Sequence, residues 1–229
     1  MRIRVAVHNV RGFRDDRSAL EELHRSIDAD VLLLNETGPR WKLRRFARTL
    51  GYRVAGDPRS FPRRRAKDAV LARVPWRIAE HRQQRFSGSA PLYPRAALFA
   101  RLELEGGGST WWAVSMHLGL RPTERIAHAE QVLGSIRGLR SPVVLGGDLN
   151  ELPDGAAVAR LTRWLHDAWA VAGEGPAETF PARDPSARID YVLVSQGFSV
   201  EGASVPRDPM VARSSDHRPV VVDLELRDA

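Results

Sequence analysis

Two segments of the chain repeat one order of features, and this order limits the folds available to it. In each segment a helix-like pattern leads into a short apolar run that ends in polar and acidic residues. Residues 16–28 lead into VLLLNE at 31–36, and residues 122–139 lead into VVLGGDLN at 143–150. Short apolar runs of this kind are typical of strands buried on both faces. The repeat predicts two buried strands whose polar ends open onto one site, where strand termini hold short side chains rigidly.

The rest of the chain supplies further strands and helices. Strand candidates are bounded by Gly, Pro and Asp, and they cover 2–8, 69–74, 95–104, 111–117, 189–194 and 219–226. Apolar residues at spacings of three, four and seven predict two more helices, at 40–50 and 155–165. Many strands with helices between them predict an α/β (α+β) chain in which two packed sheets carry helices on the outside.

Composition limits the class of protein. A chain of 229 residues, 43% of them hydrophobic, is long enough for one substantial core, so we expect a single domain over residues 1–229. The absence of cysteine excludes disulfides, thiolate metal sites and a cysteine nucleophile. No stretch approaches the roughly 18 apolar residues that cross a membrane, and the N-terminus lacks the apolar segment of a secretory signal. We therefore expect a soluble, cytoplasmic monomer.

The chain is basic, with a net charge of +7 from 35 Lys and Arg against 28 Asp and Glu. This balance favours polyanionic partners, because cationic side chains release counterions from phosphates. All but two of the basic residues are arginines, a skew that genome composition alone can produce. The most basic loop contains Arg63, Arg64 and Arg65. It is interpreted either as a phosphate clamp, with Phe61 as a stacking platform, or as a solvated loop.

The motif Gly147-Asp148-Leu149-Asn150 follows the second buried run. On an extended chain, residues two apart point to the same side, so Asp148 and Asn150 are expected to face one point. A carboxylate and an amide placed in this way suit a hard cation and a phosphoryl oxygen. The alternative is an Asx-turn that only caps the following helix.

Three polar residues end other strand candidates. Glu36 ends the first buried run and is interpreted as a metal ligand or as a solvated carboxylate. His117 ends the candidate at 111–117, where a histidine bonded to the backbone is the alternative to a catalytic one. Asn9 follows the first strand and could bond a metal ligand or a phosphate oxygen, or serve only as a turn residue.

A loop before the last strand carries Asp216 and His217. It would suit a histidine that contacts a phosphoryl group, although an acid beside a histidine is common by chance. Asp190 begins the strand candidate at 189–194 and could accept a hydrogen bond from such a histidine. A carboxylate partner fixes the tautomer of an imidazole and favours its charged form. The alternative for Asp190 is a turn residue at the start of a strand.

The order of these motifs spans nearly the whole chain. They are HNVRG at 8–12, LLLNET at 32–37, SMHL at 115–118, GGDLNELP at 146–153, RIDYVLVS at 188–195 and SDHRPV at 215–220. This order resembles the endonuclease/exonuclease/phosphatase superfamily, which includes DNase I-like nucleases, exonuclease III-like abasic-site endonucleases, bacterial sphingomyelinases and inositol polyphosphate 5-phosphatases. GDLN together with SDHRP is the most specific part. The resemblance implies a four-layer αββα sandwich with two packed central β-sheets and outer helices.

The resemblance also implies a metal site that uses Mg²⁺ or sometimes Mn²⁺. By analogy, Glu36 is the principal metal ligand and Asn9 lies beside it. Asp216 binds a metal or positions His217.

The remaining roles concern water and phosphate. Asp148 positions or deprotonates the attacking water, with His217 and Asp190 as the alternative general base. Asn150 holds the phosphate, His117 bonds a phosphoryl oxygen, and His217, supported by Asp190, contacts the scissile phosphate. These roles fit phosphoester hydrolysis, which needs charge neutralisation and an in-line water.

The sequence departs from the family pattern in places. Asn35 stands where glutamine is common, and Ser115-Met116 replaces an Asn-Thr pair, which removes a threonine hydroxyl that would contact phosphate. Abasic-site endonucleases usually carry a mid-chain tyrosine; Tyr93 lies near that place, but the motif around it differs. Arg95 is the alternative phosphate contact.

We therefore expect a Mg²⁺- or Mn²⁺-dependent phosphodiesterase, a nuclease that acts on DNA or RNA. One alternative is a phosphatase or phosphodiesterase for a small or lipid phosphoester. The other is a nucleic-acid-binding module without catalytic activity, against which the intact set of site residues argues.

Overall fold

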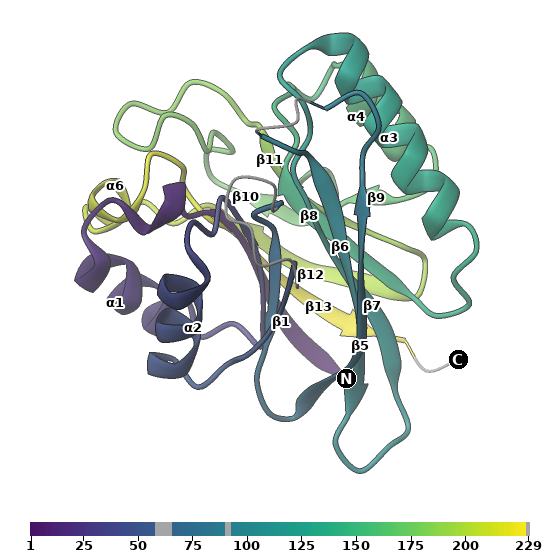
Figure 1. The fold of residues 1–229 in the computed structure, drawn as a ribbon, viewed down its shortest axis with the longest axis horizontal. Coiled ribbons are helices and arrows are strands. Elements are labelled where there is room, and N and C mark those ends of the chain that lie inside the picture. The colour runs from purple at the N-terminus through teal and green to yellow at the C-terminus, as the bar shows by residue number, and fades with distance from the viewer. Residues whose placement is uncertain (58–65, 90–92, 228–229) are drawn as a thin grey trace.

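Two mixed β-sheets pack face to face in the computed structural model, and helices cover both outer faces (Figure 1). The structure describes residues 1–57, 66–89 and 93–227. The first sheet has the order β10-β12-β13-β1-β2-β4-β3 and the second the order β5-β6-β7-β8-β11-β9. The predicted four-layer αββα arrangement is confirmed.

The first sheet joins the two ends of the chain. Its strands are β1 (Arg2–Asn9), β2 (Val31–Asn35), β3 (Arg53–Gly56), β4 (Ala69–Ala72), β10 (Gly173–Glu174), β12 (Phe198–Ser204) and β13 (Val220–Leu226). The last strand, β13, pairs antiparallel with β1, which in turn pairs parallel with β2. This pairing brings the loop before β13 to the carboxyl ends of β1 and β2.

The second sheet is formed by the middle of the chain. Its strands are β5 (Trp76–Arg85), β6 (Ala96–Leu104), β7 (Thr110–Met116), β8 (Val143–Asp148), β9 (His166–Asp167) and β11 (Asp190–Val194). β7 and β8 pair parallel, and β11 runs antiparallel to β8 with Asp190 opposite Asp148. The start of β11 and the end of β8 therefore lie side by side.

The helices follow the expected layers. α1 (Arg17–Ile27), α2 (Arg40–Thr49) and the short α6 (Val211–Ser214) pack their apolar side chains on the first sheet. α3 (Pro122–Ile136) and α4 (Ala156–Leu161) pack on the second. The short α5 (Ala168–Ala172) contacts β11 and β12, and a turn of 3-10 helix, η1 (Arg11–Phe13), follows β1. No described helix is both long and apolar enough to cross a membrane.

Alternation along β2 explains why its sequence is apolar throughout. Val31 and Leu33 point into the core between the sheets, whereas Leu32 and Leu34 point into the layer beneath α1 and α2. Successive side chains of a strand point to opposite faces, so a strand covered on both sides needs apolar residues at every position. β1 and β8 are also covered on both faces, and these strands were recognisable in the sequence.

The repeated helix-to-strand segments are confirmed as two parallel crossovers. α1 lies between β1 and β2 in the chain, and α3 lies between β7 and β8.

Elements that lack the apolar signature were missed, chiefly β5 and β12. β5 has the sequence WRIAEHRQQR and pairs only with β6 at the edge of its sheet, so most of its side chains meet solvent. The candidate at 155–165 is too long, because the helix ends at Leu161.

A close approach between β8 and the end of β7 depends on Gly147. Its φ is +147°, and a Cβ added there would lie 1.8 Å from the carbonyl oxygen of Met116. Gly147→Ala is therefore expected to lower the free energy of unfolding by about 3 kcal/mol or more, because the clash is with backbone. Gly107→Ala is the matched control, since Gly107 also has positive φ but no atom within 4 Å of the added Cβ. Urea denaturation measures both; equal, small losses would show that this approach does not require glycine.

Candidate active site

The carboxyl ends of β1, β2 and β8 meet at one point of the sandwich, together with the start of β11. In the register of the parallel pair β1–β2, Asn9 lies beside Asn35, so Glu36 emerges next to Asn9. Across the sheets, the side-chain oxygen of Asn35 accepts a hydrogen bond from the backbone N–H of Asp148 at 2.9 Å. The two predicted strand ends therefore do open onto one site.

In the sequence, Asn35 stands out only as a departure from the family pattern. In the structure, its side-chain amide at the end of β2 forms hydrogen bonds to β7, to β8 and to the residue before β4. Its nitrogen donates to the Asp68 carboxylate at 2.9 Å and to the carbonyl of Met116 at 3.1 Å. Asp68 precedes β4, and burial raises its pKa to about 6 although His117 and the Asn35 hydrogen bond lower it. Only the fold brings Asp68 and Asn35 together, so sequence patterns gave no signal for the pair.

Asp148 is the centre of the site and is buried. Its Oδ2 accepts a hydrogen bond from the side-chain amide of Asn9 at 3.0 Å and lies 3.3 Å from Nε2 of His117 and 3.8 Å from Nε2 of His217. Burial alone raises the pKa of Asp148, but the two histidines favour the ionised form more strongly and bring its pKa well below the usual value. The site thus holds an ionised carboxylate at a fixed position.

His217 and Asp190 form a buried pair. Nδ1 of His217 lies 2.9 Å from Oδ2 of Asp190, and its ring packs against Phe180 at a centroid distance of 4.8 Å. Burial lowers the pKa of His217, but the charge of Asp190 and the hydrogen bond to it prevail and raise it to about 9. The imidazole is therefore charged at neutral pH, and its Nε2 faces Asp148.

Behind His217 lies a second buried contact that was not predicted. Nε2 of His8 lies 3.1 Å from the carbonyl oxygen of His217, and Nδ1 of His8 lies 3.0 Å from Nε2 of His24. Burial lowers the pKa of His8 to about 3, so the ring is neutral and donates to the carbonyl. This chain of neutral rings fixes the backbone that carries His217.

The expected extended geometry of Asp148 and Asn150 is wrong. β8 ends at Asp148, and Asn150 has a φ of +50°. Its backbone N–H donates to Oδ1 of Asp148 at 2.9 Å, which is an Asx-turn, and its amide nitrogen donates to the carbonyl of Leu118 at 3.2 Å. The turn aligns the Asp148 carboxylate and leaves the Asn150 amide tied to the loop after β7.

Arg95 reaches the site, whereas no contact places Tyr93 there among the described residues. Nη1 of Arg95 lies 2.5 Å from Nδ1 and 2.6 Å from Nε2 of His117, so the guanidinium lies against the imidazole beside Asp148. The Tyr93 side chain is 70% exposed. The predicted clamp residues Arg63, Arg64 and Arg65, with Phe61, lie outside the described residues.

Glu36 and Asp216 both contact the segment that follows Asn9. Glu36 has a φ of +52°, and its carbonyl accepts from Gly12 N–H at 2.6 Å, while its carboxylate has no partner among the described residues. Asp216 forms an ion pair with Arg11 at 3.1 Å. The carboxylate of Glu36 is thus available to a cation, whereas that of Asp216 is already paired.

The chemistry of the donor set suits a divalent cation. Ligand atoms of Asp148, Asp190 and His217 all lie within 4.8 Å of one another, so this buried group could hold a metal ion. Oδ1 of Asp190 is buried and has no hydrogen-bond partner in the described part of the chain. Carboxylate oxygens are the ligands that hard cations such as Mg²⁺ and Mn²⁺ prefer.

The sequence itself matches a family model. The model, described as the endonuclease/exonuclease/phosphatase family, matches residues 6–217. The chain belongs to this family. This match confirms the predicted superfamily. Members of the family are phosphoester hydrolases that depend on divalent metals. No curated protein sequence matches the chain significantly.

Solved structures share the fold of this family member at low sequence identity. An endonuclease/exonuclease/phosphatase from Bacteroides vulgatus has a TM-score of 0.86 at 20% identity, over 99% of this chain and 100% of the other. The Bacteroides thetaiotaomicron mannosyl-6-phosphatase Bt3783 has a TM-score of 0.84 at 20% identity, over 98% and 100%. The human Nocturnin catalytic domain, which has a bound sulfate, has a TM-score of 0.79 at 18% identity, over 98% and 94%.

The His217–Asp190 pair can be tested without a substrate. Asp190→Asn removes the charge that stabilises the imidazolium, so the pKa of His217 should fall from about 9 to below the ordinary 6.5. NMR titration of the histidine ring signals in EDTA measures this shift. Asp223→Asn, at the far end of the first sheet, is the control and should leave the signal unchanged.

The same pair makes stability depend on pH. A raised pKa in the folded state contributes stability that is fully present below pH 6.5 and is lost as pH rises through about 9. This part of the pH dependence should be absent in Asp190→Asn. A His217 that titrates near 6.5 in both proteins would contradict the charged pair.

Proposed function

We propose that the chain is a divalent-metal-dependent phosphodiesterase that cleaves nucleic acid, with Asp148 orienting the attacking water. The observation that carries the proposal is the position of one ionised carboxylate, Asp148, between Asn9, His117 and a charged His217. A fixed acceptor beside a fixed cation suits a reaction in which a water must be aligned and phosphoryl charge stabilised.

The metal would be held by Glu36, with Asn9 and Asp216 nearby. Glu36 is favoured over the buried Asp148–Asp190–His217 group because a charged His217 cannot donate a ring nitrogen lone pair to a cation. The bound Mg²⁺ or Mn²⁺ would supply charge neutralisation at the phosphoryl oxygens. Asp216 would contribute only if its ion pair with Arg11 opens.

Histidine and arginine side chains would bind the phosphate. His217, charged and held by Asp190, presents Nε2 to the site and would donate a hydrogen bond to a phosphoryl oxygen. Arg95 and His117 lie together on the other side of Asp148 and would bind a second oxygen. Asn150 would contact the phosphate once its amide leaves the Leu118 carbonyl.

Asp148 remains the preferred group to receive the proton of the water. His217 already carries a proton at neutral pH, so it cannot act as the base there, and it suits the role of an acid or a cation. The depressed pKa of Asp148 keeps it ionised and makes it a strong orienting acceptor for water, although a weak base.

Two features favour nucleic acid as the substrate. The net charge of +7 favours polyanions, and two arginines reach the site, Arg11 after β1 and Arg95 before β6. The second candidate is a small phosphoester. It is favoured by the similarity in fold to a mannosyl-6-phosphatase over 98% of this chain.

A substrate panel separates the candidates. With Mg²⁺ or Mn²⁺ the protein is expected to cleave single- or double-stranded DNA or RNA, and EDTA is expected to abolish cleavage. Gel and phosphate-release assays on polynucleotides, sugar phosphates and phospholipids measure the preference. Phosphate release from monoesters without any polynucleotide cleavage would select the small-substrate function, and no turnover of any substrate would leave a binding module.

The role of Asp148 predicts a large catalytic loss. Asp148→Asn keeps the shape and the Asx-turn acceptor but removes the charge, so kcat should fall by about 10² to 10⁴. The matched control is Asp154→Asn, an exposed residue of the loop after β8, which should retain full activity. Equal activity of the wild type and an Asp148→Ala, His217→Ala double variant would show that the turnover came from a contaminant.

The Glu36 carboxylate should contribute more to metal binding than to nucleic-acid binding. Glu36→Gln removes a carboxylate that has no partner among the described residues, so the metal concentration for half-maximal activity should rise by about tenfold or more. DNA affinity measured in EDTA at several salt concentrations should change little. Glu22→Gln, on the exposed face of α1, is the control. Parallel losses in metal response and DNA affinity would contradict this division of roles.

A further inference from the structure

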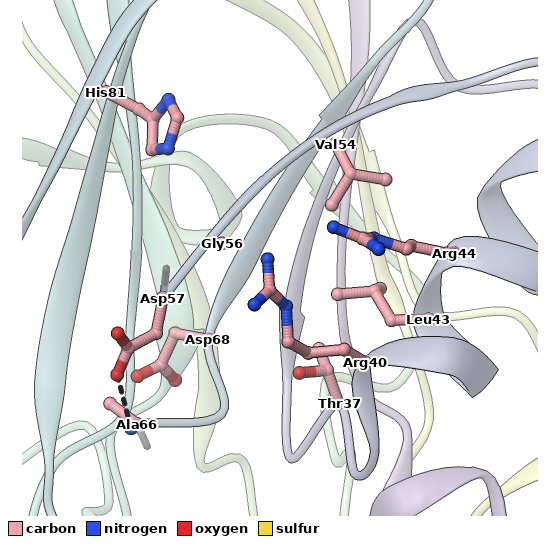
Figure 2. Close-up of a pocket in the computed structure, with 10 residues that line it drawn as sticks. All are labelled: Thr37, Arg40, Leu43, Arg44, Val54, Gly56, Asp57, Ala66, Asp68 and His81. Atoms are coloured by element: carbon pink, nitrogen blue, oxygen red, sulfur yellow. Dashed lines mark hydrogen bonds between the residues drawn. The ribbon is translucent and has the colours of Figure 1, made fainter. Parts of the chain in front are cut away.

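A cavity of about 280 Å³ lies beside the candidate active site, between α2 and the strands β3 and β5 (Figure 2). One wall carries Arg40 and Arg44 of α2, and His81 of β5 stands on the opposite side. Leu43 and Val54 lie beside the two arginines and supply apolar surface. The cavity thus combines cationic groups with an apolar wall, which is the composition that a nucleotide requires.

The wall of the cavity adjoins residues of the candidate active site. Its lining includes Thr37, which directly follows Glu36 and donates its N–H to the carbonyl of Lys67 at 2.9 Å. It also includes Asp68, whose carboxylate accepts a hydrogen bond from Asn35 at 2.9 Å. Asn35 in turn accepts from the N–H of Asp148. The cavity wall is therefore joined to Asp148 through Asn35 and to Glu36 through the chain itself.

The acidic residues of the cavity are engaged by the protein. Asp57 is buried, accepts from the N–H of Ala66 at 3.0 Å and lies 3.7 Å from Arg85. Asp68 is only 3% exposed and bonds Asn35. By contrast, the Arg44 side chain is exposed and makes no hydrogen bond or ion pair among the described residues. Its charge is available to an anionic ligand.

The two arginines act from one helical face. Arg40 and Arg44 are four residues apart in α2, so their side chains are neighbours on the helix surface. Figure 2 shows both guanidinium groups directed toward the space between α2 and β3. Arginine recognises phosphate through a planar fork of N–H donors. The pair is suited to binding a phosphate group.

We infer that this cavity binds the nucleotide next to the scissile phosphate, with its phosphate on Arg40 and Arg44 and its sugar or base against Leu43 and Val54. This inference rests on the proposed nuclease function, because it assigns the neighbouring phosphate of a polynucleotide to the same substrate track. It makes Arg40 and Arg44 specificity-determining residues, since a substrate with one phosphate gains nothing from them.

The test compares TpT, which has one phosphodiester, with TpTpT, which has two. In EDTA and at low ionic strength, calorimetry should show that the wild type binds TpTpT on the order of tenfold more tightly than TpT, the gain typical of charge-assisted hydrogen bonds. An Arg40→Ala, Arg44→Ala variant should lose this ratio, while its affinity for TpT stays within about twofold. Arg44→Ala alone should lose part of it.

The matched control is Arg45→Ala, Arg48→Ala, which removes two exposed arginines of the same helix that do not line the cavity. It should keep the ratio of about tenfold. For a longer oligonucleotide, the cavity variant should also lower the slope of log K against log salt by about 0.7 for each phosphate that it no longer binds. An unchanged ratio in the cavity variant, or an equal decrease in both double variants, would overturn the inference.

Two further measurements distinguish a failure of this inference from a failure of the proposed nuclease function. Thymidine 3′,5′-bisphosphate is titrated in parallel, and a dependence on Arg40 and Arg44 for this compound but not for TpTpT would overturn the polynucleotide assignment. Cleavage of TpT and TpTpT with Mg²⁺ tests the proposed nuclease function by itself. Absence of cleavage would count against that function, and the metal-free affinity ratio would still decide whether the cavity binds a second phosphate.

Discussion

The site depends on one buried amide, that of Asn35. Its oxygen accepts the N–H of Asp148, and its nitrogen donates to Asp68 and to the carbonyl of Met116, so a single side chain joins the ends of β2, β7 and β8 to the start of β4. A buried polar group of this kind is costly unless all its bonds are made. These bonds join the two sheets, so they form only when the sheets are packed in the correct relative position. The packing that completes the sandwich therefore also positions Asp148.

Burial then sets the charges at that point. Asp148 stays ionised because Asn9, His117 and His217 face it, and His217 stays protonated because Asp190 is bonded to its other ring nitrogen. The neutral His8 and His24 rings hold the backbone behind His217. The same fold thus keeps His217 charged, because a carboxylate is bonded to its ring, and keeps the buried His8 and His24 neutral, because their rings contact each other instead. This division suits phosphoryl chemistry, where a fixed cation and a fixed acceptor must coexist.

Much of this could be predicted from sequence, and the limits have physical causes. β1, β2 and β8 were recognisable because strands covered on both faces carry apolar runs, whereas the edge strand β5 is mostly polar and was missed. Glu36, Asp148 and His217 could be singled out as candidates because strand ends and their motifs are local in sequence. Asp68, His8 and Arg11 were missed as site residues because their contacts join distant segments. The Asp148–Asn150 geometry was predicted wrongly because a strand was assumed to continue where an Asx-turn ends it.

The central claim is that Glu36, whose carboxylate has no protein partner in the described chain, holds the cation while the charged His217 contacts phosphate. A crystal soaked with Mn²⁺ and measured at the manganese absorption edge tests this most directly. We expect an anomalous peak within about 2.0–2.5 Å of a Glu36 carboxylate oxygen and none bonded to Nε2 of His217. A peak coordinated instead by Asp148, Asp190 and His217, with Glu36 free, would contradict this claim.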